Sequence, residues 1–219
     1  MNIINVIFVA LNIKQTDISG KRVIEVGAYD VNGSVRPLIE ALDPGDYIGV
    51  DISAGRGVDI VCDACDLIKR FSINCFDVVI STEMLEHVGD WRLVIHNLKN
   101  ICKPGGIILI TSRSYGFFYH GYPYDFWRYE LEDMKYIFQD FDIDVLEKDP
   151  QYGVMIKAIK PLNFVEADLR EHKLYSIIAQ KRVRDLEDIN FRAFRYAKIA
   201  IKEQIRQYLS QIVHFLRSV

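Results

Sequence analysis

The feature that most constrains this chain is the regular alternation of short apolar runs with helix-forming segments. The apolar runs predict five strands, at Arg22–Val26, Tyr47–Asp51, Val58–Cys62, Phe76–Ser81 and Ile107–Thr111. Runs of this kind are typical of strands that helices cover on both faces of a parallel sheet. Helices are predicted at Ser34–Leu42, with Ser34 as the N-cap, at Trp91–Ile101 and at Glu130–Gln139.

The end of this alternating region predicts a hairpin. The runs Phe141–Glu147 and Tyr152–Ile159 are joined by residues 148–151 alone. So short a link joins antiparallel strands, so we expect the last strand to run against its neighbour and to leave a reversed pair at the sheet edge. The predicted fold is therefore α/β, with a doubly wound, Rossmann-like, seven-stranded sheet whose last strand is antiparallel, over residues 1–160.

Residues 161–219 predict a helical C-terminal extension. Pro161 closes the domain, and the stretch from Phe164 to Leu216 contains no glycine or proline. An apolar stripe follows helical spacing through Phe194, Ile201, Ile205, Leu209, Ile212 and Leu216. Packing on the domain or against a second subunit, which would make a homo-oligomer, is the commoner explanation of such a stripe. A membrane-surface helix is the alternative.

The N-terminal segment Met1–Ile13 is apolar but too short to span a bilayer. It has no basic residue and no cleavage site of the A-x-A kind, so neither a transmembrane segment nor a signal peptide is expected there. We expect this segment to pack on the domain or to fold over its ligand site.

Composition and charge indicate an ordinary globular protein with a net charge of −3. Residues 1–160 hold 16 basic and 23 acidic residues, which argues against a nucleic-acid substrate. Four cysteines make no disulfide framework in a chain of this size, so reduced thiols and a cytoplasmic location are expected. Cys62 and Cys65 have the spacing of half a zinc site, but no second pair matches them.

The loop after the first predicted strand, in "VIEVGAYDVNG", indicates a nucleoside ligand without phosphate. A dinucleotide site requires G-x-G-x-x-G, and counting from Gly27 the second and third glycines are Tyr29 and Asn32. Glu25 would also repel a pyrophosphate. These residues weaken the interpretation of the chain as a nicotinamide oxidoreductase.

Acidic residues stand at the ends of three successive strands, at Glu25, Asp51 and Asp63. Asp51 could bind two ribose hydroxyls, and Asp63 could accept a hydrogen bond from an adenine amino group. Taken singly, each acid is more simply a loop charge or a helix cap. Their order along the chain favours a ligand with an adenosine and a cationic amino-acid end.

The stretches "VIEVGAYDVNG", "YIGVDIS", "VDIVCDA", "FDVVISTEMLEHVGDW" and "ICKPGGIILIT" resemble the class I S-adenosylmethionine-dependent methyltransferases over about residues 20–160. The chain departs from their usual E/D-x-G-x-G-x-G motif at Tyr29 and Val31. The resemblance implies S-adenosylmethionine as cofactor. The cofactor-binding residues that it implies are Glu25 and Gly27 for the methionine end, Asp51 for the ribose, Asp63 and Ala64 for the adenine, and Thr82, Glu83 and Met84 for the methyl-donor pocket. Ile52, next to Asp51, is also expected to bind the cofactor.

The acceptor is expected at the loop Gly116–Tyr129, which holds eight aromatic residues in fourteen positions. Its aromatic side chains could stack on a sugar or another ring, and an aromatic plug or oligomer contact is nearly as well supported. His120 and Asp125 in this loop, and His87 after the fourth strand, are the candidate catalytic bases.

The predicted function is methyl transfer to a small molecule or glycan, at a hydroxyl group. The motif N/D-P-P-Y/F of nucleic-acid amino methyltransferases is absent, and N-methylation of a sugar amine stays open. The alternative is a non-catalytic S-adenosylmethionine-binding module whose basic helical tail holds a partner or a membrane.

The stretch "EMLEH" raises the question of a metal ion. Glu83, Glu86 and His87 follow the E-x-x-E-H pattern that some methyltransferases use to hold a divalent ion against acceptor hydroxyls. A direct histidine base, either His87 or His120, is the preferred prediction, so no metal site is assigned from the sequence.

Overall fold

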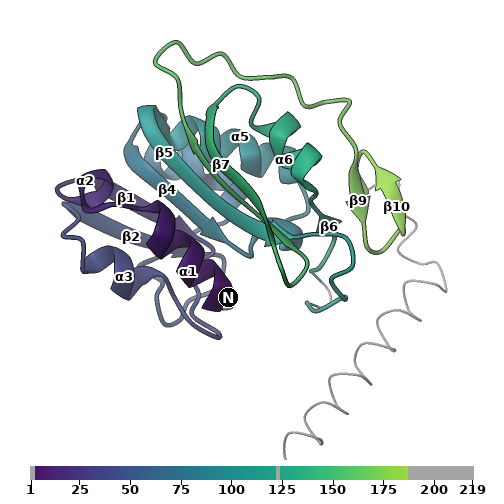
Figure 1. The fold of residues 1–219 in the computed structure, drawn as a ribbon, viewed down its shortest axis with the longest axis horizontal. Coiled ribbons are helices and arrows are strands. Elements are labelled where there is room, and N and C mark those ends of the chain that lie inside the picture. The colour runs from purple at the N-terminus through teal and green to yellow at the C-terminus, as the bar shows by residue number, and fades with distance from the viewer. Residues whose placement is uncertain (1–2, 122–123, 187–219) are drawn as a thin grey trace, which may run out of the picture.

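The computed structural model describes residues 3–121 and 124–186. Its centre is one seven-stranded sheet, in the order β3-β2-β1-β4-β5-β8-β7 (Figure 1). The strands are β1 (Arg22–Val26), β2 (Asp46–Asp51), β3 (Ile60–Val61), β4 (Phe76–Thr82), β5 (Cys102–Arg113), β7 (Asp142–Asp149) and β8 (Gly153–Ile159). Strand order reverses between β1 and β4, which is the position where ligands bind in doubly wound sheets.

The predicted sheet and its antiparallel last strand are confirmed. β1, β2, β3, β4 and β5 pair in parallel, and β8 is antiparallel to both β5 and β7. The expected antiparallel pair at the sheet edge is formed by β7 and β8, and β8, the only reversed strand of this sheet, lies between β5 and β7. The apolar run of β8 explains this inner position, since Val154, Ile156 and Ala158 are fully buried.

Helices cover both faces of the sheet (Figure 1). One face carries α1 (Ile3–Asn12), α2 (Gln15–Ile18) and α3 (Arg36–Glu40), and the other carries α4 (Leu67–Phe71), α5 (Trp91–Ile101) and α6 (Leu131–Ile137). Alternate residues of β4 enter opposite cores: Ile80 packs in the same cluster as Phe8, and Val79 packs in the same cluster as Leu98. The N-terminal segment therefore packs on the domain, as one of the two predicted alternatives had it.

Two predicted boundaries shift for local reasons. The helix predicted from Ser34 begins at Arg36 with Val35 as its N-cap, and Pro37 occupies its first turn, a position that suits proline. The Ser34 hydroxyl instead accepts a hydrogen bond from the Arg36 N–H at 3.0 Å. Helix α5 has the predicted bounds, and β5 begins directly after it at Cys102.

Residues 161–186 contain no α-helix, so the helical prediction fails for this stretch. It holds β9 (Leu174–Ser176) and β10 (Lys181–Val183), which form a second sheet with β6 (Trp127–Arg128), as Figure 1 shows. The buried residues Leu169, Leu174, Ile178 and Val183 join the core of α5. The packing thus continues past the predicted boundary at residue 160. The Phe194–Leu216 stripe lies outside the described residues.

Two further observations concern membrane-spanning helices and the state of the cysteines. Within the described ranges, no helix combines the length and apolar character of a membrane span. The four cysteines are free thiols. A cytoplasmic location stays a prediction.

Candidate active site

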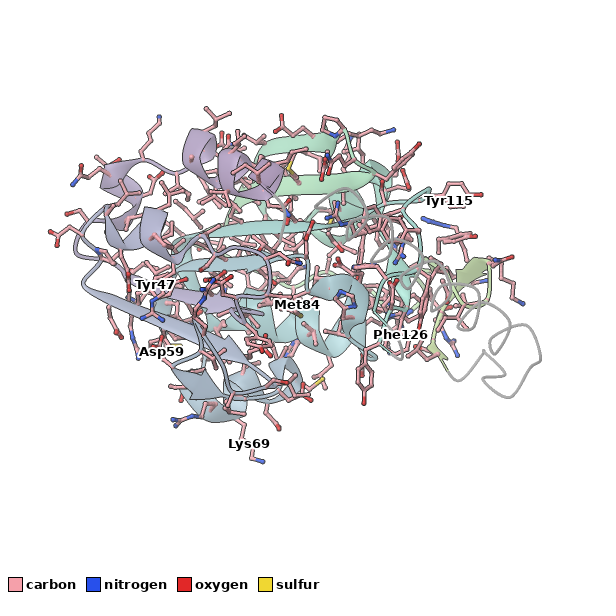
Figure 2. All side chains as sticks on the ribbon, turned by 90° about the horizontal axis from the view of Figure 1, so that it is seen from below. Tyr47, Asp59, Lys69, Met84, Tyr115 and Phe126 are labelled. Carbon is pink, nitrogen blue, oxygen red and sulfur yellow. The ribbon has the colours of Figure 1, made fainter. Side chains whose placement is uncertain are left out.

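A cleft of about 940 Å³ opens at the carboxyl ends of the parallel strands. Met84 and Phe126 both line this cleft and are labelled in Figure 2, with Phe126 on the side of the second sheet. All the residues predicted to bind the cofactor lie in its wall: Glu25, Gly27, Asp51, Ile52, Asp63, Ala64, Thr82, Glu83 and Met84. His87 and His120 line the same cleft, so the structure brings the predicted cofactor side and two of the predicted bases together.

Gly27 makes the first turn of the cleft possible. Its φ is +86°, and a Cβ built there would lie 2.7 Å from the Cβ of Met84. A side chain would therefore be strained in its backbone and would also collide with the turn after β4. Gly27 is the one glycine of the E/D-x-G-x-G-x-G motif that this chain keeps. Both its positive φ and its closeness to Met84 require glycine at this position.

The missing second glycine is explained by a neighbouring loop. Tyr29 donates its backbone N–H to Asp51 at 3.3 Å, and its ring lies against Gly55, where a side chain would collide with it. The N–H of Asp30 donates to the carbonyl of Arg56 at 2.9 Å, which joins the two loops. The glycine that accommodates Tyr29 is therefore supplied by the loop after β2.

The two acids expected at the ribose and the adenine have distinct surroundings. Asp51 ends β2 and accepts hydrogen bonds from the N–H groups of Ser53, at 2.9 Å, and Tyr29. Asp63 is the N-cap of η1 (Ala64–Asp66) and accepts from the N–H of Cys65 at 2.8 Å. One oxygen of Asp63 thus caps a helix, as the simpler interpretation had it, while the residue still lies in the cleft wall.

Glu25 is buried, at 2% exposure, and accepts a hydrogen bond from the hydroxyl of Tyr47 on β2. Burial raises the pKa of Glu25 to about 7, although the Tyr47 hydroxyl and Arg36 oppose the shift. A cation bound beside Glu25 would favour its charged form. The site is therefore suited to an ammonium group and unsuited to a phosphate.

Glu83, which the resemblance places in the methyl-donor pocket, is held by an arginine that the sequence analysis did not predict. Glu83 has a positive φ of +52° and forms an ion pair with Arg113, which is 5% exposed. The same guanidinium lies 3.4 Å from Asp149 and 4.0 Å from the centre of the Phe117 ring. Arg113 therefore joins the β4 turn to the β7–β8 hairpin and to the aromatic loop.

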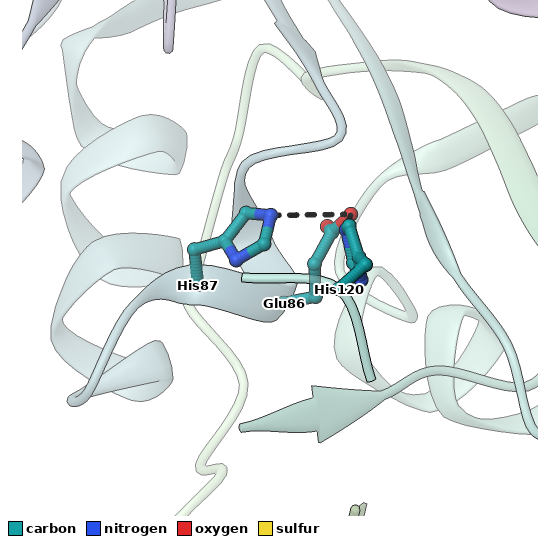
Figure 3. A group of neighbouring side chains, drawn as sticks. All are labelled: Glu86, His87 and His120. Carbon is teal, nitrogen blue, oxygen red and sulfur yellow. Dashed lines mark ion pairs between the residues drawn. The ribbon is translucent and has the colours of Figure 1, made fainter. Parts of the chain in front are cut away.

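Three side chains converge on the acceptor side of the cleft: Glu86, His87 and His120 (Figure 3). Glu86 and His87 belong to η2 (Leu85–His87). Glu86 Oε1 lies 3.9 Å from His87 Nε2 and 3.8 Å from His120 Nε2. The carboxylate is fully buried, and Oε1 has no hydrogen-bond partner among the described residues. A buried acceptor without a protein donor has room for a bound cation, a proton or a water as its partner.

The other nitrogen of each ring identifies its tautomer. His87 Nδ1 contacts the backbone carbonyl of Tyr124, and His120 Nδ1 lies 3.0 Å from Asp125. Carbonyl and carboxylate oxygens only accept hydrogen bonds, so both rings carry a proton on Nδ1. Each Nε2 is then the ring nitrogen that faces Glu86.

Asp125 was predicted as a base, but it lies behind His120 and does not line the cleft. It is fully buried and takes two hydrogen bonds from Arg128, at 2.6 and 2.9 Å. Burial raises the pKa of Asp125, but the hydrogen bonds from His120 and Arg128 outweigh it and hold the pKa below its ordinary value. An acceptor proton cannot reach this carboxylate directly.

The sequence interpretation missed several residues around the cleft, notably Tyr47, Arg113 and Arg128. It also missed Gly121, where a Cβ would lie 2.8 Å from the His87 ring. The only sequence signal for any of them is the spacing of Asp125 and Arg128 in "DFWR", an oppositely charged pair in an aromatic run.

Comparisons with known proteins identify the family of this chain. A family model described as a methyltransferase domain matches residues 8–147, which is more than half of the chain. The chain therefore belongs to this family of S-adenosylmethionine-dependent methyltransferases, and the predicted resemblance is confirmed.

Individual relatives are distant. A ubiquinone biosynthesis O-methyltransferase from Chromobacterium violaceum is 27% identical over 112 residues, which cover 45% of this chain and 47% of that protein. An S-adenosylmethionine dependent methyltransferase structure from Mesorhizobium loti has a TM-score of 0.52 at 14% identity, covering 66% of this chain and 93% of its own.

The 1,6-didemethyltoxoflavin-N1-methyltransferase of Burkholderia thailandensis, solved with S-adenosylhomocysteine, has a TM-score of 0.52 at 12% identity, covering 65% of this chain and 72% of its own. These two structures show a shared fold. The chain spans less than half of the length of the O-methyltransferase that it matches.

Proposed function

We propose that this protein transfers the methyl group of S-adenosylmethionine to a hydroxyl group of a small molecule or glycan. The observation that carries the proposal is one cleft that joins an acid-lined cofactor side to a Glu–His–His cluster. Family membership supports the cofactor. The name of the Chromobacterium violaceum relative supports oxygen as the methylated atom.

The cofactor side supplies recognition. Glu25 would bind the ammonium group, Asp51 with Ile52 the ribose, and Asp63 with Ala64 the adenine. Thr82, Glu83 and Met84 would then surround the sulfonium. Methyl transfer is an in-line displacement at carbon, so holding donor and acceptor in line supplies much of the rate.

The acceptor side supplies the means of removing the hydroxyl proton. Two Nε2 atoms and one carboxylate oxygen lie within 4.8 Å of one another, an arrangement that favours positive charge at its centre. The unpartnered Glu86 Oε1 fits a divalent cation, and two imidazoles with one carboxylate suit Zn²⁺ or Mn²⁺ better than Mg²⁺. When bound, such an ion lowers the pKa of a coordinated hydroxyl.

We therefore propose Glu86, His87 and His120 as the holders of a divalent cation, in place of the direct histidine base expected from the sequence. The chain's own part is to hold both rings in one orientation, through the contacts of their Nδ1 atoms with the Tyr124 carbonyl and with Asp125. Self-association through the Phe194–Leu216 stripe remains a separate proposal.

The test measures formation of S-adenosylhomocysteine with phenol, catechol and sugar acceptors. We expect turnover with at least one class of hydroxyl acceptor. Cofactor binding without turnover on any of them would favour the non-catalytic binding module. Absence of cofactor binding would defeat the proposal entirely.

Chelation then tests the cation. A chelator should abolish methyl transfer and leave the affinity for S-adenosylhomocysteine unchanged, and Mn²⁺ or Zn²⁺ should restore the transfer. Full activity in chelator would instead make His87 or His120 the direct base, to be told apart by His→Ala at each position.

A further inference from the structure

The buried guanidinium of Arg128 lies behind the Glu86–His87–His120 cluster, and all of its donors are used. Its Nε donates to the carbonyl of Phe117 at 3.3 Å, Nη1 to that of Trp127 at 2.7 Å and Nη2 to that of Phe118 at 2.9 Å. The two remaining N–H groups bind the oxygens of Asp125. A guanidinium has five donors, so none is left over.

Asp125 links the guanidinium of Arg128 to His120. One carboxylate oxygen accepts both the backbone N–H of His120, at 2.8 Å, and its ring Nδ1, at 3.0 Å. The same oxygen also takes a hydrogen bond from Arg128. Because that oxygen is fixed by Arg128, the ring of His120 has one preferred tautomer and one orientation, with Nε2 toward Glu86.

Arg128 also anchors the acceptor loop, which we define as residues 114–121 and 124–126. It holds carbonyls at the first part of this loop and a carboxylate at the second. Its own place is set by β6, where Arg128 pairs with Tyr175 of β9. Arg128 is 1% exposed and does not line the cleft, so it contacts neither ligand.

We infer that Arg128 is a positioning residue for the reaction, which sets the tautomer and aim of His120 through Asp125. The inference rests on the function proposed above only in its prediction that kcat falls when Arg128 is replaced. A lysine at this position keeps the charge but has three donors and no planar fork. It would leave at least two of the five acceptors without a donor from residue 128, and the carboxylate that holds His120 would lose the planar pair of hydrogen bonds that fixes it.

The experiment compares the full-length wild type with Arg128→Lys. Nitrogen-15 NMR of the histidine rings, in chelator and without cofactor, reports the tautomer directly. We expect His120 to be protonated at Nδ1 in the wild type and to gain the Nε2–H form in Arg128→Lys. We expect kcat to fall at least tenfold, while KM for S-adenosylmethionine changes by less than twofold.

A matched control is available at Asp140. This carboxylate is also buried and paired with a buried cation, Lys99, at 2.6 Å, and neither residue lines the cleft. Asp140→Asn should lower the melting temperature without changing the His120 tautomer or kcat. This separates a loss of positioning from a general loss of stability.

The inference is overturned if Arg128→Lys folds, keeps the Nδ1–H form of His120 and retains kcat within twofold. If Arg128→Lys does not fold, Asp125→Asn provides the same comparison against Asp140→Asn, with the same expected and overturning results. A wild type that transfers no methyl group defeats the proposed function. The tautomer measurement would still decide the role of Arg128 in that case.

Discussion

Glu25 is the residue whose protonation should set the pH range of cofactor binding. Its pKa is raised to about 7 by burial, so about one molecule in ten has the charged form at pH 6. The ammonium group of the cofactor requires that form. We expect the affinity for S-adenosylhomocysteine to be roughly tenfold weaker at pH 6 than at pH 8, measured by calorimetry.

Two variants test this assignment. Tyr47→Phe removes a hydrogen bond that lowers the pKa of Glu25, so the midpoint of the binding curve should move to higher pH. Glu25→Gln should flatten the curve. Without ligand, the native state holds a proton that the unfolded chain loses above pH 4.5, so the free energy of unfolding should fall between pH 4.5 and 7. An affinity that is flat from pH 6 to 8 in the wild type would contradict the role of Glu25.

Asp51 should contribute to affinity through hydrogen bonds to the ribose. Asp51→Ala is expected to weaken binding of S-adenosylmethionine by about 1–3 kcal/mol, the range for charge-assisted hydrogen bonds. Asp66→Ala is the matched control, because Asp66 is an exposed acid three residues from Asp63 that does not line the cleft. Equal affinities for the two variants, measured by calorimetry, would remove the ribose role from Asp51.

At the scale of elements, the junction between β1 and the turn after β4 depends on Gly27. Gly27→Ala should lower both the melting temperature and the cofactor affinity, because the new methyl group would lie 2.7 Å from Met84. Gly20→Ala controls for backbone strain alone, since Gly20 also has a positive φ, +67°, but has no atom within 4 Å of a new Cβ. Similar losses in both variants would show that the contact with Met84 is unimportant.

The elements that could be predicted are those with a strong local pattern. β1, β4 and α5 match their predicted ranges within one residue, because each combines a clear apolar pattern, periodic in α5, with a clear end. The acids at the strand ends were found because parallel strands bring their carboxyl ends to one edge. The role of Tyr47 could not be predicted, since its contact with Glu25 depends on the register between β1 and β2. β9 and β10 escaped prediction because each is only three residues long, and β9 pairs with the distant β6 while β10 pairs with β9.

At the scale of the whole molecule, the described part of the predicted extension supports the acceptor loop. Tyr175 of β9 packs on Tyr115, with ring centres 4.8 Å apart, and Ile177 donates its N–H to Phe126 at 3.0 Å. Arg92 of α5 donates to the carbonyls of Leu169 and His172. The domain should therefore require residues 161–186.

Truncation tests this boundary. A chain that ends at residue 186 should fold and bind S-adenosylhomocysteine like the full-length protein. A chain that ends at residue 163 should melt at a clearly lower temperature, because it exposes Trp127 and removes Leu174 and Val183 from the core. Equal melting temperatures would contradict the structural role of β9 and β10. Light scattering of the full-length and 186-residue chains would test self-association through the Phe194–Leu216 stripe.

The most direct test of the central claim is a crystal structure of the full-length protein with S-adenosylhomocysteine. The account predicts the ribose at Asp51, the adenine beside Asp63, the amino group at Glu25, and the sulfur facing the Glu86–His87–His120 cluster. A ligand bound elsewhere, or bound in this cleft with its sulfur directed away from that cluster, would contradict the proposed methyl transfer.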